Sequence, residues 1–344
     1  MNKSVIKKIK NGDTITYDIR IPNNFKLFRM RADNAYCFSA FLNDEIWGTI
    51  PEGFNDPYDT VSIFHIKKLY SYAKLKIEEQ KELLAILCNI NGIDNDEYAS
   101  SKLSKLLVDM LVSNDNIQKQ KTTVCACFTE KIDNEIMWAH YANNAKGFAL
   151  EYDYNKLKEF GTEIEEKSIN VIKDNFNFWD IEEDDANYRM PMTIVPAIYD
   201  NSKYDMTEYL EKVIENELNN VKTVYILKQE LTLGKSLVNL IGLTKSFRLN
   251  ETAFLHMNSF KKTDWKYERE WRLIAYNMNP FFLNQSIHYN IGRFVPSAIY
   301  LGERISEYNR MILIAIARKK GIRIYQMKSK MYKNTMKLTY YEIK

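Results

Sequence analysis

The pattern of apolar and polar positions changes several times along the N-terminal half of the chain, and each change predicts a different element. Residues 25–31, FKLFRMR, alternate apolar and basic side chains, which is typical of a half-buried β-strand. Residues 44–59 predict a short strand that runs into a loop stiffened by two prolines. Residues 62–118 then carry apolar side chains at helical spacing, and residues 122–129, TTVCACFT, return to strand spacing.

From residue 133 onward the sequence predicts a series of strands and two helices with recognisable signals at their ends. Residues 133–142 predict a helix with Asp133 or Asn134 as its N-cap, and a second helix is expected to begin at Ser306 and to end at Gly321. The remaining apolar segments predict strands at 147–153, 195–200, 265–276, 296–302, 322–328 and 337–343.

Together these elements predict an α+β protein whose core is a single mixed, mostly antiparallel sheet. Strands from both ends of the chain are expected to share that sheet. Helical insertions are expected near residues 62–118 and 203–255. Because no internal repeat and no linker rich in glycine or proline marks a boundary, residues 1–344 are interpreted as one domain.

Length and composition favour a folded protein without a membrane partner. The chain has 344 residues, of which 45% are hydrophobic, so it can fill a sizeable core. No run of about 18 apolar residues occurs, and the N-terminus lacks the apolar stretch of an export signal. We therefore expect the protein in the cytoplasm.

The cysteines are scattered at positions 37, 88, 125 and 127, without a zinc-binding spacing. Cys125 and Cys127 would share one face of a strand, and we interpret all four as reduced thiols that pack as small apolar side chains. No metal is expected under the leading hypothesis below.

Basic side chains are concentrated near the C-terminus. The whole chain has a formal net charge of +3, but residues 256–344 contain 17 basic and 6 acidic side chains. This basic third suits a nucleotide or dinucleotide ligand, or a nucleic-acid or protein acceptor. Solvated surface lysines would give the same count, so both interpretations stay open.

The late segment EREWR carries the densest candidate chemistry. Period-two geometry would place Glu268, Glu270 and Arg272 on one face of a strand. Two carboxylates and a guanidinium in one place can serve a site, but an exposed ladder of ion pairs would show the same pattern.

The segment FNDPYD supplies Asn55, Asp56 and Asp59 on a proline-stiffened loop. Their oxygens could face a metal ion, a sugar hydroxyl or an arginine. The alternative is a turn in which these side chains only bind their own backbone.

The segment MWAHYA places Trp138, His140 and Tyr141 on a short helix, where an imidazole lies beside aromatic rings that can stack on a base. A hydrogen-bonded core histidine is the alternative. Phosphate-binding glycine loops, HExxH and GxSxG are absent, which argues against most nucleotide-fuelled and serine-hydrolase chemistries.

The ordered motifs LFRMR, FNDPYD, VCACFT, IMWAHYANNAKGFALEYD, WKYEREWRLI and AIYLGERI resemble those of the bacterial family known as domain of unknown function 2971. That family shows FNDPFD, CFS followed by MWxHYA, and a terminal ExEWR. The resemblance spans roughly residues 25–305, with Thr129 in place of the usual serine. It implies an accessory bacterial protein, with a role in stress or phage defence.

The order of motifs also resembles ADP-ribosyltransferase folds, which place an arginine on the first strand, a hydroxyl residue on a middle strand and ExE late. Here Arg29, Thr49 or Thr129, and Glu268 with Glu270 follow that order. The resemblance implies NAD as the ligand, Glu270 as stabiliser of the ribosyl cation and Glu268 as the group that orients or deprotonates the acceptor. It further implies stacking of nicotinamide on Trp47 or Tyr58, ligand contacts from Arg31, Asn55, Asp56, Asp59, Trp138, Tyr141 and Arg272, and catalytic roles for His140 and Thr129.

Two other functions explain the same residues. In a divalent-metal nuclease or phosphohydrolase, Asp56, Asp59, Glu268 and Glu270 would hold Mg²⁺, and the basic third would hold the nucleic-acid backbone. In a non-catalytic sensor or interaction module, the polar cluster would only bind a nucleotide or a partner. A metal-dependent activity would distinguish the nuclease or phosphohydrolase from the transferase. A Glu270→Gln substitution that leaves every cellular effect intact would indicate the non-catalytic module.

Overall fold

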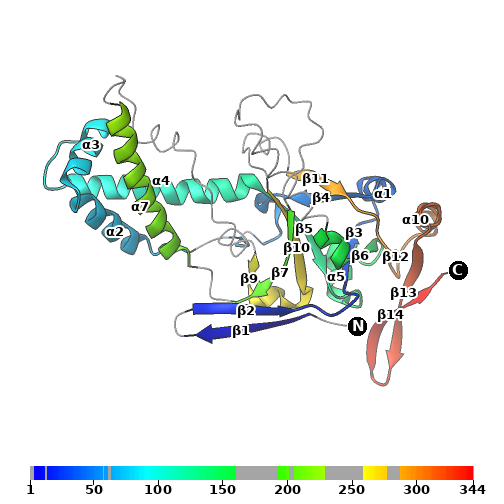
Figure 1. Ribbon diagram of the computed structural model, residues 1–344. Coiled ribbons are helices and arrows are strands. Elements are labelled where there is room, and N and C mark those ends of the chain that lie inside the picture. Colours follow the sequence, from blue (N-terminus) through cyan, green and yellow to red (C-terminus); the bar gives the residue numbers. More distant parts are fainter. Residues whose placement is uncertain are drawn as a thin grey trace. The chain divides into compact units, whose positions relative to one another are not determined.

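The computed structural model describes residues 4–11, 14–56, 58–60, 63–159, 192–200, 205–228, 259–276 and 287–343 (Figure 1). It divides into two compact units. The first unit comprises Met1–Asp59, Gln120–Asn201 and Lys261–Lys344, and the second comprises Thr60–Lys119 and Ser202–Phe260. The second unit coincides closely with the predicted insertions near 62–118 and 203–255, and the interpretation as one domain stays a prediction.

The first unit is built on a ten-stranded sheet, which confirms the predicted α+β class. Its central order is β11-β4-β5-β3-β6-β12-β13-β14, and β10 pairs with both β5 and β7. Among the described strand pairs of this sheet, only β12 and β13 are parallel. The strands are β3 (Lys26–Arg31), β4 (Glu45–Thr49), β5 (Thr123–Thr129), β6 (Phe148–Asp153), β7 (Met192–Pro196), β10 (Glu270–Tyr276), β11 (His288–Arg293), β12 (Ala298–Leu301), β13 (Arg323–Tyr332) and β14 (Thr335–Glu342).

Shorter elements surround this sheet. β1 (Val5–Asn11) and β2 (Thr14–Arg20) form an antiparallel hairpin that the sequence analysis did not predict. β8 (Ile198–Tyr199) follows β7, and β9 (Phe260–Lys261) precedes a 3₁₀ helix, η2 (Thr263–Glu268). A second 3₁₀ helix, η1 (Pro51–Gly53), follows β4 and begins the predicted rigid loop.

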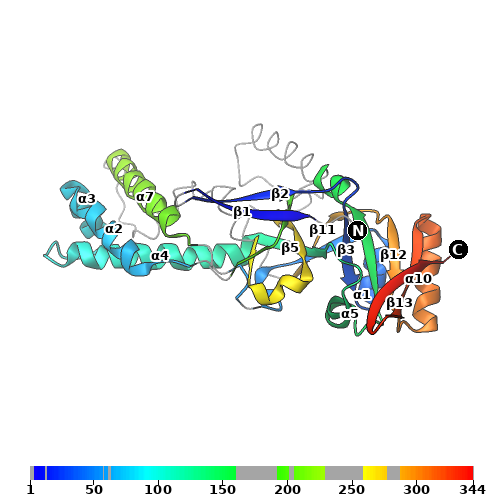
Figure 2. The ribbon, with the colours of Figure 1, turned by 90° about the horizontal axis from the view of Figure 1, so that it is seen from below.

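Helices cover the sheet and create two apolar clusters. α1 (Ala35–Leu42) and α10 (Glu307–Lys320) contribute to the larger cluster, and α10 lies against β12 and β13 (Figure 2). α5 (Glu135–Tyr141) contributes to a second cluster that includes Trp138 and Tyr300. β3 is therefore buried on both faces, and the prediction of a half-buried strand was wrong because Arg29 is as buried as its apolar neighbours.

Helix ends follow the predicted signals. The side chain of Asn134 accepts hydrogen bonds from the backbone N–H groups of Ile136 and Met137, so Asn134 is the N-cap of α5. α10 has Ser306 as its N-cap and Gly321 in the left-handed conformation at its end.

The segment 265–276 departs from its prediction. Only Glu270–Tyr276 is a strand, whereas Thr263–Glu268 is the 3₁₀ helix η2. Arg269 separates them with a φ of 44°, a conformation that breaks the strand period. The prediction that Glu268 lies on the strand was therefore wrong.

The second unit is helical. It contains α2 (Ile66–Glu78), α3 (Lys81–Asn91), most of α4 (Ala99–Thr122) and α7 (Thr207–Lys228), and its core includes Leu69, Leu83, Leu103 and Leu210. In the part of the chain that the structure describes, no helix combines the length and the apolar composition needed to cross a membrane.

Candidate functional site

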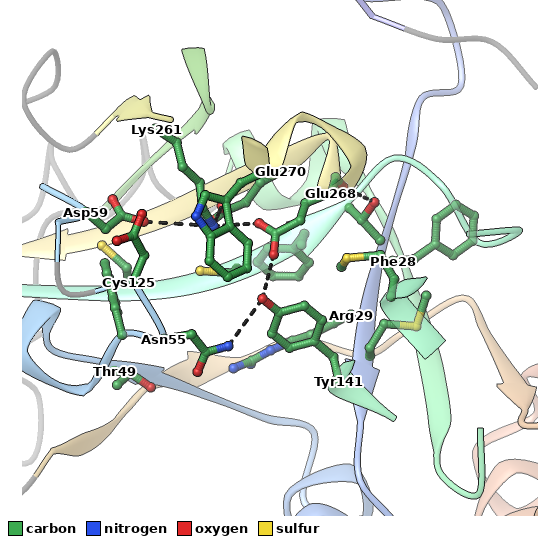
Figure 3. A pocket seen from close by; sticks show the side chains of 18 of the residues that line it. Phe28, Arg29, Thr49, Asn55, Asp59, Cys125, Tyr141, Lys261, Glu268 and Glu270 are labelled. Atoms are coloured by element: carbon green, nitrogen blue, oxygen red, sulfur yellow. Dashed lines mark hydrogen bonds and ion pairs between the residues drawn. The ribbon is translucent and has the colours of Figure 1, made fainter. Parts of the chain in front are cut away.

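A cavity of about 200 Å³ lies in the first unit, at residues contributed by β3, β4, η1, β5, α5, β9, η2 and β10. Segments far apart in the sequence therefore converge on one pocket (Figure 3). The lining includes these residues singled out from the sequence: Arg29, Arg31, Thr49, Asn55, Asp56, Asp59, Thr129, Tyr141, Glu268 and Glu270.

Lys261 joins three carboxylates at one end of this pocket. Its Nζ lies 2.5 Å from Glu268 Oε2 and 2.7 Å from Glu270 Oε2, and it lies 3.8 Å from Asp59 Oδ2 (Figure 3). These side chains are nearly inaccessible to solvent, so the charges interact at short range with little screening. The acidic groups of the loop and of the late motif thus belong to one network.

Arg272 lies behind this network and is completely buried. Its NH1 and NH2 groups donate to the two carboxylate oxygens of Asp59 at 2.8 and 2.6 Å, and its Nε donates to Glu270 Oε1 at 2.9 Å. Burial of all three groups contradicts the alternative of an exposed ion-pair ladder.

Glu268 binds a second set of partners. The Tyr141 hydroxyl donates to Glu268 Oε1 at 2.5 Å, and the Asn55 amide donates to that hydroxyl oxygen at 3.3 Å (Figure 3). Burial, followed by the charge of Glu268, raises the pKa of Tyr141, which keeps its phenol protonated as a donor.

The two glutamates differ in their ease of protonation. Burial acts to raise the pKa of Glu270, but Arg272 and Lys261 outweigh it and hold this pKa well below its usual range. Burial raises the pKa of Glu268, and the charge of Glu270 adds to this effect against the opposing Lys261. Such a divergence between neighbouring carboxyl groups is a common basis for separate acid–base roles.

Thr129 fixes the position of Glu268. Its buried hydroxyl donates to the Glu268 carbonyl oxygen at 2.5 Å and accepts from the Lys131 backbone N–H at 3.1 Å. The Asn134 amide donates to the Tyr267 carbonyl oxygen at 2.6 Å. These bonds hold the end of η2 against β5, so the Glu268 side chain reaches the pocket although it lies outside the strand.

Two arginines line the pocket apart from the carboxylates. Arg29 donates to the carbonyl oxygen of Trp47, and its guanidinium lies 5.8 Å from the centre of the Phe128 ring. Burial, and then the charge of Arg31, lower the pKa of Arg29 from 12.5 to about 9. Among the described residues neither arginine forms an ion pair, so this region of the pocket suits an anion.

Asp56 combines a turn with an available acceptor. Its Oδ1 accepts a hydrogen bond from the Tyr58 backbone N–H at 2.9 Å, as the turn interpretation of FNDPYD expects. Its Oδ2 is buried and has no hydrogen-bond partner within the described part of the chain. Because a buried acceptor without a partner is costly, this oxygen favours a ligand that donates a hydrogen bond.

The four cysteines are free, and only Cys127 is exposed among them. Cys127 lines the pocket, where the protein atoms packed around its thiol displace water; this desolvation, and then the nearby Glu270, raise its pKa well above the usual value. Burial raises the pKa of Cys125 to about 12. Neither thiol is therefore a ready nucleophile at neutral pH.

Several predicted residues lie outside the pocket lining. His140 is exposed, which also contradicts its interpretation as a core residue. Trp138 is buried, and its Nε1 donates to the Ile132 carbonyl oxygen at 2.7 Å. Trp47 and Tyr58 are exposed side chains that do not line the cavity.

The sequence analysis missed Lys261, Phe54, Trp265 and Cys127 as residues of the pocket. Lys261 belongs to a strand of two residues, which is too short for a periodic signal. Trp265 was assigned to a strand but lies in η2. Phe54 follows η1, and its ring lies 5.7 Å from the guanidinium of Arg272.

Three of the four carboxylates proposed for a metal ion already have cationic partners. Asp59, Glu268 and Glu270 form ion pairs with Lys261, and two of them also with Arg272. In the described ranges, no three His, Cys, Asp or Glu side chains are arranged to hold a metal. Two cations offset two of these three negative charges, so the network keeps at most one net negative charge, which is little for Mg²⁺.

Comparison with known proteins gives a match to one family model over part of the chain and no match to an individual protein. No curated protein and no solved structure matches the chain. The family match includes the segments that contribute Tyr141, Lys261, Glu268, Glu270 and Arg272 to the site, whereas Arg29 and the FNDPYD loop precede it. The predicted resemblance is thus confirmed for part of the chain: residues 137–273 match the family described as Protein of unknown function (DUF2971).

Proposed function

We propose that the pocket binds NAD and cleaves its nicotinamide–ribose bond, with transfer of ADP-ribose to water or to a macromolecular acceptor. The observation that carries the proposal is the distribution of charge in the pocket. The carboxylate network of Asp59, Glu268 and Glu270 lies in the same cavity as two arginines without ion-pair partners among the described residues. NAD has the complementary charges, a cationic pyridinium ring and an anionic diphosphate.

The arginines would hold the diphosphate. Arg29 and Arg31 come from alternate positions of β3, so their side chains leave the strand on the same face. A guanidinium offers several N–H donors to phosphate oxygens, and a partly dehydrated site strengthens this contact. The free Oδ2 of Asp56 would accept a hydrogen bond from a ribose hydroxyl.

Glu270 would stabilise the positive charge that develops on the ribose. Arg272 and Lys261 hold its carboxylate ionised and fixed, so it need not reorganise during the reaction. Because Arg272 donates hydrogen bonds to it, Glu270 would supply a fixed negative charge and would not take up a proton.

Glu268 would accept the proton of the acceptor. As the C1′–N bond breaks, its electron pair returns to the ring nitrogen and neutral nicotinamide leaves. An acceptor hydroxyl or water forms the new C1′–O bond, and its proton passes to the Glu268 carboxylate. The raised pKa of Glu268 makes it the better proton acceptor of the two glutamates.

The size and the walls of the cavity fit one part of a dinucleotide. About 200 Å³ is less than the roughly 300–1,000 Å³ of pockets that enclose drug-sized ligands. Phe54 and Trp265 line this space and offer aromatic faces to nicotinamide. The nicotinamide riboside part would occupy the cavity, and the adenosine part would extend from it.

The experiment is to incubate the purified protein with NAD and to quantify nicotinamide by chromatography, with and without protein and nucleic-acid acceptors. Glu270→Gln should lower the rate at least about 100-fold, because the charge opposite the ribosyl cation is lost. Glu135→Gln changes an exposed glutamate outside the pocket and should leave the rate unchanged. Absence of nicotinamide release under every acceptor condition would refute the proposal.

A second candidate is a sensor that binds the same ligand without turnover. It is favoured by the closed ion-pair network, in which Lys261 and Arg272 already engage both glutamates. Titration calorimetry with NAD and ADP-ribose separates the two functions. Binding that is unaffected by Glu270→Gln, together with intact NAD after long incubation, supports the sensor.

A further inference from the structure

The C-terminal hairpin of β13 and β14 has two different faces. β13 and β14 lie side by side as a hairpin (Figure 1), and the residues from Tyr325 to Tyr332 lie opposite those from Glu342 to Thr335 in a regular antiparallel register. Residues that lie directly opposite each other point to the same side of the sheet. The register therefore assigns each side chain of the hairpin to one face.

One face, here called the basic face, consists of Lys328, Lys330, Tyr332, Lys337 and Tyr341. All five side chains are exposed. The opposite face is mostly apolar, with Met327 buried against the body of the unit and Met331 and Met336 nearer the turn, and it also carries Tyr340. Within the paired register the lysines are thus gathered on a single side, whereas tyrosines occur on both sides.

The basic face breaks a rule of strand pairing. Lys330 lies directly opposite Lys337, and like charges in that arrangement repel each other. In the described residues no carboxylate forms an ion pair with either of them or with Lys328. The Nζ of Lys337 instead lies 4.6 Å from the centre of the Tyr332 ring. This ring contact offsets part of the repulsion, and no carboxylate among the described residues offsets the rest, which favours an anionic partner.

The tyrosines restrict the kind of anion. Tyr332 is 57% exposed and Tyr341 is 49% exposed, so both rings are accessible to a ligand. Flat rings interleaved with lysines match the stacking platforms on which unpaired bases rest while cations follow the backbone. A duplex keeps its bases stacked on one another and would leave both rings unused.

We infer that the basic face of the β13–β14 hairpin binds single-stranded nucleic acid. Lys328 and Lys330 contact phosphates about 7 Å apart along one strand, and Lys337 does so from the other. Tyr332 and Tyr341 stack on bases. This surface is separate from the pocket residues, so it goes beyond the proposed reaction and supplies a macromolecule that the protein can hold.

The experiment measures fluorescence anisotropy of labelled single strands of about 12 nucleotides, DNA and RNA, with the full chain over a salt series. The variant Lys328→Ala, Lys330→Ala, Lys337→Ala should bind at least tenfold more weakly. Its slope of log affinity against log salt should fall by about 2, since each phosphate contact contributes about 0.7 on a single strand. The matched control removes the same charge at Lys146, Lys156 and Lys319, which are exposed elsewhere in the unit.

Two further variants separate recognition from folding and from simple charge. Replacing the three hairpin lysines by arginine should preserve affinity, because the charges remain. Tyr332→Ala should weaken binding about tenfold without a change in salt slope.

Any of four results would overturn the inference. The first is that the wild-type protein binds no single strand at low salt, and the second is that the control variant loses as much affinity as the hairpin variant. The third is that a duplex of the same sequence binds as tightly as the single strand. The fourth is that vesicles of anionic lipid bind in preference to the oligonucleotide, which would indicate that Met331 and Met336 contact a membrane instead.

Discussion

Replacing Arg29 by methionine should make the ligand-free protein more stable and should weaken its binding of ADP-ribose. Arg29 is only 8% exposed, and its described contacts are the Trp47 carbonyl oxygen and the Phe128 ring. The charge of Arg31 opposes it. Burial of the Arg29 cation therefore lowers the stability of the fold, and no counter-charge among the described residues offsets this effect.

The magnitude follows from the pKa. A fall from 12.5 to about 9 is about 3.5 units, and at about 1.36 kcal/mol per unit the buried charge costs about 5 kcal/mol at most. Methionine keeps much of the apolar stem but leaves the Trp47 carbonyl oxygen without its donor, which costs about 1–3 kcal/mol. The net expectation is a gain of about 2 kcal/mol in the free energy of unfolding.

Urea unfolding measures the stability, and titration calorimetry with ADP-ribose measures the affinity. Lys26→Met is the control on the same strand, because Lys26 pairs with Asp153 at a partly exposed position and should change stability by less than about 1 kcal/mol. The affinity of the Arg29 variant should fall at least tenfold, whereas the control should bind as the wild type does. A loss of more than about 1 kcal/mol of stability in the ligand-free Arg29 variant, or unchanged affinity, would refute the reasoning.

Three more predictions concern the carboxylate network. Arg272→Met should lower the free energy of unfolding by about 3–5 kcal/mol in urea titrations, because the buried carboxylates of Asp59 and Glu270 lose their guanidinium partner and keep only Lys261 as a counter-charge; a loss as small as that of the exposed-pair variant Arg310→Met would contradict this. The pKa of Glu268 in the folded state is raised above 4.5, so the free energy of unfolding should fall as pH rises through the window just above 4.5. A Glu268→Gln variant whose free energy of unfolding falls as steeply with pH as that of the wild type would disprove this prediction. Maleimide should label Cys127 faster in Glu270→Gln than in wild type at neutral pH, since the Glu270 carboxylate adds to the effect of desolvation in raising the pKa of that thiol. Equal labelling rates by mass spectrometry would argue against this effect of Glu270.

Much of the sheet and its helices could be predicted because their signals are local. Alternation over 122–129 and 147–153 corresponds to β5 and β6, and the caps Asn134 and Ser306 start the expected helices. Capping and periodicity depend on neighbouring residues alone, so one sequence suffices to detect them.

The predictions that failed concern residues whose environment is set by distant parts of the chain. Arg29 has the pattern of a half-exposed strand, but neighbours from distant segments cover both faces of β3. Glu268 has the spacing of a strand residue, but the left-handed Arg269 ends that period. Lys261 gave no signal, because its role depends on three carboxylates that come from other elements.

The register of three neighbouring strands fixes how far apart the early arginine and the late glutamate lie. Glu270 on β10 lies opposite Thr129 on β5, and Thr129 lies opposite Phe28 on β3, so these three residues share a face. Arg29 follows Phe28 and leaves β3 on the other face, with β5 between its strand and β10, and both Arg29 and Glu270 line the same cavity. A shift of one residue in either pairing would exchange the faces of the strand. The proposed chemistry therefore depends on the register of β3, β5 and β10 as much as on the identity of the charged side chains.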